Sequence, residues 1–271
     1  MLNEEQNWDE ISKTPGLNEE FIREHSDKLD WFCISQYQKL SEEFIVEFSD
    51  KVLWDGISIY QKLSEDFIRE FSDKVNWSSI STYQRLSEEF IRENSYIVNW
   101  WNVSIYQKLS EKFIREFFNE VDLYNIALYQ KLSPELIKEY NLTIPNTCWL
   151  YKDKEFKREY IKNNTEYEII GDKVIAYKSC RSDGYSAFNF QYHYETGKEY
   201  ESHANSNIDD YNSFGLSAWT KDGALDYNSS GKLFKVEIDL EDIAAIVHGG
   251  NKIRASKIKI LEEIKTYLFL C

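Results

Sequence analysis

A 23-residue pattern occurs six times in the first half of the chain, and it constrains the fold more than any other feature. The copies open with Trp8, Trp31, Trp54, Trp77, Trp100 and Leu123. Thirteen residues after these come Phe21, Phe44, Phe67, Phe90, Phe113 and Leu136. A fixed period of this length predicts a solenoid, in which each unit buries its apolar side only against its neighbours. Solenoids usually offer surfaces for partners rather than catalytic pockets.

Each copy is expected to form two short helices. Apolar residues recur at spacings of three and four, as in helices, and N-cap signals divide the copy in two. One signal is a serine followed by acids, at Ser41, Ser64, Ser87, Ser110 and Ser133, where Pro134 fits the first helical position. The other precedes the opening residue, at Asn7, Asp30, Asn76, Asn99 and Asp122, with Leu53 as the exception. We expect loss of Ser64 or Ser87 to destabilise the fold, and loss of Ser58, inside a helix, to matter less.

Such short helices need partners, because isolated helices below about 12 residues are marginal in water. We therefore expect the Trp, Tyr and Phe positions to be core, with Trp31, Trp54 and Trp77 buried. The alternative for this aromatic stripe is a cofactor-binding site.

The copies differ mainly in the residues that follow the opening one. The first of these are Phe32, Asp55, Ser78, Trp101 and Tyr124. Two interpretations stay open: this row contacts a partner, or it faces solvent and is unconstrained.

The charge is acidic and unevenly distributed. The chain has 47 acidic and 32 basic residues, a net charge of −15, of which residues 1–144 carry −12. Such an array opposes binding to a phosphate backbone, which requires Lys and Arg. It suits a basic protein partner, or solubility alone.

The period ends near residue 144, so we expect a helical repeat solenoid over 1–144 and a small α+β, mostly antiparallel domain over 145–271. A helix is expected in "YKDKEFKREYIKNN", and another after Thr220 as N-cap. Strands are expected in "EYEII", "KVIAYKSC", "FNFQYHY", "FGLSAW", "KLFKVEID", "DIAAIVH" and "KIRASKIKIL". Gly171-Asp172 and Gly249-Gly250 fit hairpin turns.

Polar residues near these strands are the candidates for chemistry. Arg181, Ser217 and Glu237 are candidate catalytic residues, with Glu237 on the outer or cleft face of its strand by alternation. His193, His203 and Trp219 are candidate binding residues, although a lone His is more often structural. No metal-ligand spacing, nucleotide loop or nucleophile elbow is present, so we predict no metal and no cofactor.

The four cysteines are widely spaced, no signal peptide precedes Trp8, and no apolar stretch reaches the ~18 residues of a membrane span. We expect no membrane association and a reducing, cytoplasmic compartment.

The "W..IS.YQKLSEEFI.EFSDKV" copies resemble a short helical repeat of hypothetical proteins from giant viruses and bacteriophages. The stretch from "VIAYKSCRSDGYS" to "WTKDGAL" resembles an uncharacterised carboxy-terminal domain of similar proteins. Together these resemblances cover nearly the whole chain and imply a viral or phage origin, but no activity. Arg181, Ser217 and Glu237 also occur in the order typical of ADP-ribosyltransferase-like domains. The chain departs from that pattern because it has no Ser-Thr-Ser string and because Glu237, in "VEID", is not part of a Glu-x-Glu pair.

The sequence therefore favours a non-enzymatic protein–protein interaction module that binds a host or viral protein. One alternative is an ADP-ribosyltransferase-like enzyme that uses NAD, for which the three candidate catalytic residues must converge on one cleft. Another is an acidic mimic of nucleic acid that inhibits a host DNA-binding protein, for which carboxylates must be spaced like phosphates on one face. A plain scaffold needs neither.

Overall fold

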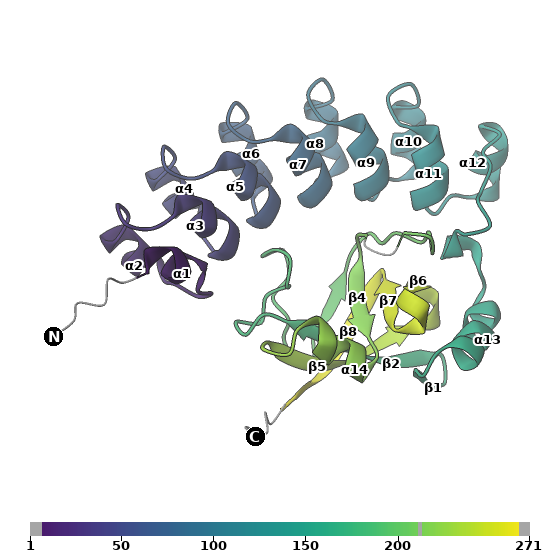
Figure 1. Ribbon diagram of the computed structural model, residues 1–271. Coiled ribbons are helices and arrows are strands. Elements are labelled where there is room, and N and C mark those ends of the chain that lie inside the picture. Colours follow the sequence, from purple (N-terminus) through teal and green to yellow (C-terminus); the bar gives the residue numbers. More distant parts are fainter. Residues whose placement is uncertain (1–6, 211–212, 266–271) are drawn as a thin grey trace. The chain divides into compact units, whose positions relative to one another are not determined.

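The computed structural model describes residues 7–210 and 213–265 (Figure 1). These residues divide into two compact units. The first unit contains residues 7–98 together with the short segment 188–192. The second contains 99–187 and the described residues from 193 onward. The secondary structure changes from helix pairs to strands after residue 164, whereas the two units divide within the helical copies.

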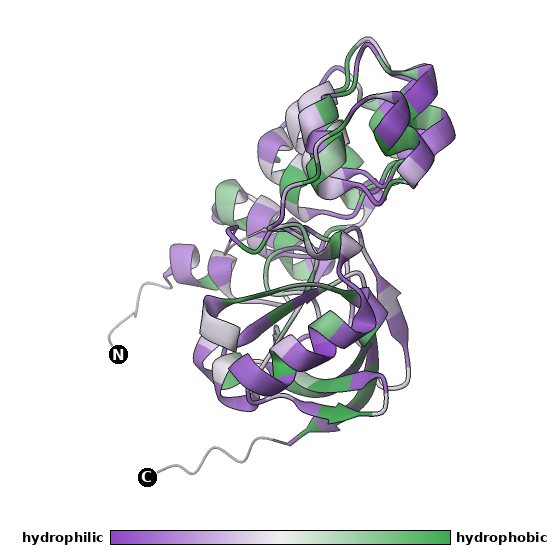
Figure 2. Ribbon diagram, turned by 90° about the vertical axis from the view of Figure 1, so that its right-hand side faces the viewer, coloured by the Kyte–Doolittle hydropathy of each residue, from purple (hydrophilic) through white to green (hydrophobic). Residues whose placement is uncertain are grey.

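The first unit contains four helix pairs with the 23-residue period. They are α1 (Trp8–Lys13), α2 (Glu19–Glu24), α3 (Trp31–Tyr37), α4 (Glu42–Glu47), α5 (Trp54–Tyr60), α6 (Glu65–Glu70), α7 (Trp77–Tyr83) and α8 (Glu88–Glu93). The first helices of successive pairs pack on one another, α1 on α3, α3 on α5 and α5 on α7. Figure 2 shows that the helices carry both hydrophobic and hydrophilic residues.

The expected helix starts are confirmed. The hydroxyls of Ser41, Ser64 and Ser87 each accept the backbone N–H three residues later, as N-caps do. Side chains before the opening Trp cap the first helices in the same way, and Leu53 makes no such bond.

The aromatic positions divide between full and partial burial, which corrects the expectation that all of them are buried. Phe44, Phe67 and Phe90 are at most 5% exposed. The Trp residues are only half-buried, packed against the edge of the same core. The reason is the polar indole N–H, which stays near the surface and donates to a backbone carbonyl in the preceding turn, as Trp77 does to Ser72 at 2.9 Å.

Buried polar side chains join each copy to the next. The amide of Gln61 donates to the carbonyls of Ser35 and Gln38 and accepts from the N–H of Leu40. Gln84 repeats this pattern one copy later. These bonds satisfy carbonyls at helix C-termini, which have no partner within the helix.

The serine within the first helix also bridges two copies, which argues against the expectation that Ser58 matters less than the capping serines. Its hydroxyl, fully buried, donates to the Trp54 carbonyl at 2.7 Å and accepts the N–H of Asn76 at 3.0 Å. Asn76 is the N-cap of the following copy, so Ser58 fixes where that copy begins.

The second unit begins with two further helix pairs. They are α9 (Trp100–Tyr106), α10 (Glu111–Glu116), α11 (Leu123–Tyr129) and α12 (Pro134–Glu139), with Pro134 in the first turn as expected. A 3₁₀ turn, η1 (Trp149–Tyr151), and α13 (Lys154–Asn164) lead into the sheet.

All ladders of the C-terminal sheet are antiparallel. Its strands are β1 (Glu168–Ile170), β2 (Lys173–Cys180), β3 (Glu199–Glu201), β4 (Leu216–Trp219), β5 (Lys232–Asp239), β6 (Ile243–Val247), β7 (Lys252–Ala255) and β8 (Lys257–Ile264). The order is β3-β8-β5-β2-β4-β7-β6, and β1 also pairs with β2. The helix α14 (Lys221–Tyr227) packs on β2 and β4. Two 3₁₀ turns, η2 (Leu240–Asp242) and η3 (His248–Gly250), flank β6.

Most of the expected strands and turns of this half are confirmed. Gly171-Asp172 joins β1 to β2 with Gly171 at φ 62°, and the Gly249-Gly250 turn joins β6 to β7. The segment "FNFQYHY" is not a strand, because its backbone and side chains bond to the helical copies instead. The short strand β3 was not expected.

Candidate protein-interaction surfaces of the repeats

The variable row, defined as Phe32, Asp55, Ser78, Trp101 and Tyr124, is exposed in both units. Its large members are among the most exposed aromatic side chains described: Phe32 is 56% exposed, Trp101 57% and Tyr124 68%. The residue after each of these is more buried; Cys33, for example, is 3% exposed. The row is therefore one position wide on each first helix.

A second row, which we call the tyrosine row, consists of Tyr60, Tyr83, Tyr106 and Tyr129, the last residues of α5, α7, α9 and α11. The expectation that the tyrosines belong to the core was wrong, since these rings are only partly buried and contact segments from the C-terminal half. Their position explains this, because a helix end leaves its last side chain beside the outgoing loop.

In the first unit, the segment 188–192 lies on the tyrosine row. The ring of Phe188 is 5.7 Å from each of the rings of Tyr60 and Tyr83. The N–H of Phe190 donates to the Tyr60 carbonyl at 3.0 Å. The Gln191 amide donates to the Gln61 carbonyl and to the Gln84 side-chain oxygen, at 3.2 and 3.0 Å.

In the second unit, Phe214 takes the equivalent place on Tyr106 and Tyr129, at ring distances of 4.9 and 5.8 Å. The ring of His203 stacks on Phe214 at 5.2 Å and approaches the Gln130 amide. Burial lowers the pKa of His203 to about 4. His203, a candidate binding residue, therefore lies within an internal docking contact.

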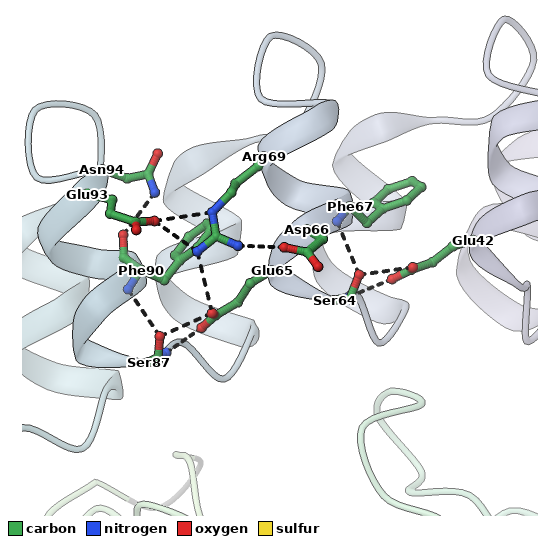
Figure 3. Close-up of polar contacts among 10 residues, drawn as sticks. All are labelled: Glu42, Ser64, Glu65, Asp66, Phe67, Arg69, Ser87, Phe90, Glu93 and Asn94. Atoms are coloured by element: carbon green, nitrogen blue, oxygen red, sulfur yellow. Dashed lines mark hydrogen bonds and ion pairs between the residues drawn. The ribbon is translucent and has the colours of Figure 1, made fainter.

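Many carboxylates of the repeats already have partners within the protein (Figure 3). Glu65 accepts the N–H of Ser87 in the next copy at 2.6 Å and its hydroxyl at 3.1 Å. Arg69 pairs with Glu93 of the next copy at 2.9 Å and with Asp66 at 2.7 Å. Equivalent pairs recur, so part of the acidic composition holds neighbouring copies together.

The three candidate catalytic residues lie in different segments, and Glu237 is far from Arg181. Glu237 is opposite Ile175 in the β2–β5 ladder, and Arg181 follows the far end of β2. At about 3.3 Å per residue, these backbone positions are about 20 Å apart. Glu237 pairs with Lys173 at 3.0 Å, and Arg181 with Asp183 at 3.1 Å. The backbone carbonyl of Ser217, on β4, accepts a hydrogen bond from the Lys178 ammonium group.

The expected alternation along β5 is confirmed around Glu237, because Val236 and Ile238 are buried while Glu237 is not.

His193 and Trp219, the other two candidate binding residues of the C-terminal half, have different surroundings. His193 is exposed in the loop beside Glu195, with Nδ1 3.3 Å from its carboxylate. Trp219 stacks on Tyr227 at 5.3 Å, with the Lys252 ammonium 5.0 Å from its ring.

Within residues 7–210 and 213–265, no group of three or more potential metal-ligating side chains is present. None of the helices in these ranges is long and apolar enough to cross a bilayer. Cys33, Cys148 and Cys180 are free and buried, whereas Cys271 lies outside the described residues.

Neither a protein-family model, nor a curated protein, nor a solved structure significantly matches this chain.

Proposed function

We propose that this chain is a protein-interaction module whose six copies form one α-solenoid and bind a host or viral protein through the variable row. The observation that carries the proposal is the exposure of large aromatic side chains at one fixed position of the copies, Phe32, Trp101 and Tyr124. Aromatic residues are enriched at the centres of protein interfaces, where they supply much of the binding energy.

The charge supports a basic partner. The net charge of −12 over residues 1–144 steers positively charged proteins toward the repeats and repels nucleic acids. Asp55 adds an exposed carboxylate to the variable row itself. The partner is therefore a protein with Lys and Arg around an apolar patch, and its association weakens as salt is raised.

The alternatives have less support. An ADP-ribosyltransferase-like site requires Arg181 and Glu237 in one cleft, and the β2–β5 register separates them. A nucleic-acid mimic requires carboxylates free to face a DNA-binding protein, whereas Glu65 and Glu93 are bonded between copies.

The test is affinity capture from the cells that naturally express the chain, with quantitative mass spectrometry. The variant Phe32→Ala/Trp101→Ala/Tyr124→Ala should lose a partner that the unaltered protein retains. The matched control removes three exposed aromatic rings elsewhere, Tyr96, Phe156 and Tyr227. Loss of the same partner by both variants, or by neither, would contradict binding through the variable row.

A further inference from the structure

The tyrosine row recognises an aromatic ring in the same manner in both units. Phe188 contacts Tyr60 and Tyr83, and Phe214 contacts Tyr106 and Tyr129, in each case two tyrosines one period apart. The two phenylalanines come from different loops with different neighbours. The recurring element is the tyrosine pair, so the site belongs to the repeat rather than to one loop.

Polar contacts fix the direction of the bound segment in the first unit. The Phe190 N–H reaches the carbonyl of Tyr60, and the side chain of Gln191 reaches Gln61 and Gln84. Tyr60 is the last residue of α5, where helix carbonyls need outside donors. The site therefore contacts three groups of the segment: the ring of Phe188, the backbone N–H of Phe190 two residues later, and the side-chain amide of Gln191 three residues after the ring.

The segment 188–192 is only partly buried at this site. Phe190 is 3% exposed, whereas Phe188, the ring between the two tyrosines, remains 52% exposed. The segment forms no strand, and it carries no acid or base. Beside it, the Arg85 guanidinium lies 5.5 Å from the Tyr192 ring.

We propose that the tyrosine row is a second binding site, distinct from the variable row, which accepts a bent, uncharged segment of the pattern Phe-x-x-Gln from a partner protein. Residues 188–192 are the internal occupant of this site at Tyr60 and Tyr83, and a partner segment competes with them. An internal competitor is present at an effective concentration in the millimolar range, so it weakens the binding of a free peptide by a large factor.

The experiment uses a fluorescent peptide with the sequence of residues 186–194, Ser-Ala-Phe-Asn-Phe-Gln-Tyr-His-Tyr, and fluorescence anisotropy. Full-length Phe188→Ala/Gln191→Ala protein, whose internal segment has lost the ring and the amide that contact the tyrosine row and its glutamines, should bind the peptide about tenfold or more tightly than unaltered protein. The matched control is Ser182→Ala, an exposed residue of the same loop, which should bind like unaltered protein. Adding Tyr83→Ala to the opened variant should remove most of the gain.

A measurement on unaltered protein guards against misfolding of the variants. A saturating concentration of the peptide should accelerate amide hydrogen exchange in residues 188–192, and a peptide lacking that ring and that amide should not. Equal peptide affinity of the opened and unaltered proteins, or unchanged exchange, would overturn the proposal. A dimer in light scattering that dissociates when the peptide is added would also overturn the proposal, because residues 188–192 of a second copy would then occupy the tyrosine row. The Phe32→Ala/Trp101→Ala/Tyr124→Ala variant should bind the peptide with the affinity of unaltered protein. Failure of the variable row to bind a partner would therefore leave the peptide measurements unchanged, and the two proposals are tested separately.

Discussion

Replacing Gln61 by Met removes one link between copies while keeping the volume of the side chain. Gln61 is 1% exposed and makes three hydrogen bonds, of 3.0 and 2.8 Å to the carbonyls of Ser35 and Gln38 and of 3.1 Å from the N–H of Leu40. The variant leaves these three backbone groups without their side-chain partner in a buried place. Each lost bond of this kind costs about 1–1.5 kcal/mol, so the variant should lose about 3–4 kcal/mol of unfolding free energy.

The assay is urea unfolding of the full chain, followed by tryptophan fluorescence and by circular dichroism. The two probes should give coincident transitions, because repeat arrays can lose two-state behaviour. The matched control is Lys62→Met, which makes the same new side chain at the next, exposed position and should change stability by less than about 0.5 kcal/mol. A loss below about 1 kcal/mol for Gln61→Met, or one equal to that of the control, would refute the argument that these bonds hold the copies together.

Three further predictions follow from single side chains. Ser64→Ala should cost about 1 kcal/mol as a lost N-cap, and Ser58→Ala at least as much because it leaves the part-buried N–H of Asn76 without its acceptor. Urea unfolding of both variants measures the difference, and an unchanged stability of Ser58→Ala would contradict the role of Ser58 as a bridge between copies. Trp77→Ala should cost about 2–3 kcal/mol rather than the larger loss of a fully buried ring, by the same assay. The pKa of His203 is about 4 in the folded protein and about 6.5 in the unfolded chain, so the unfolded state binds the proton first as the pH falls. The free energy of unfolding should therefore fall by about 2–3 kcal/mol between pH 6.5 and pH 4. A His203→Gln variant with the same pH dependence of stability would show that His203 does not cause it.

The helical copies were predictable because their signals are local. A serine followed by acids caps a helix through its own backbone, so Ser64 marks the start of α6 without any tertiary information. The hairpin at Gly171 has the same local character. Repetition strengthened both kinds of inference, because each copy tests the same pattern again.

Long-range partners were not predictable from these signals. The alternating aromatic pattern of "FNFQYHY" suits a strand, yet Phe190 and Gln191 bond to residues more than a hundred positions earlier. The tyrosine row was missed for a related reason. The helical spacing of the tyrosines predicted that they are buried in the core. Only the position of Phe188 in the structure shows that Tyr60 and Tyr83 contact a segment of the C-terminal half instead. A signal was present in the Tyr-Gln pair that closes the first helix in copies two to six.

Many bonds between copies recur once per period. Glu42 bonds to Ser64 as Glu65 bonds to Ser87, and Gln61 bonds to the Gln38 carbonyl as Gln84 bonds to that of Gln61. Removing residues 54–76 would place Leu53 before Trp77 and offer Glu42 the hydroxyl of Ser87 and Gln38 the amide of Gln84. The bond of Arg69 to Glu93 would be lost, because Val46 takes the equivalent place. Unequal recombination between such similar segments would therefore change the length of the array while keeping most of the bonds between copies. Copy number is thus a quantity that evolution can vary in whole steps of 23 residues.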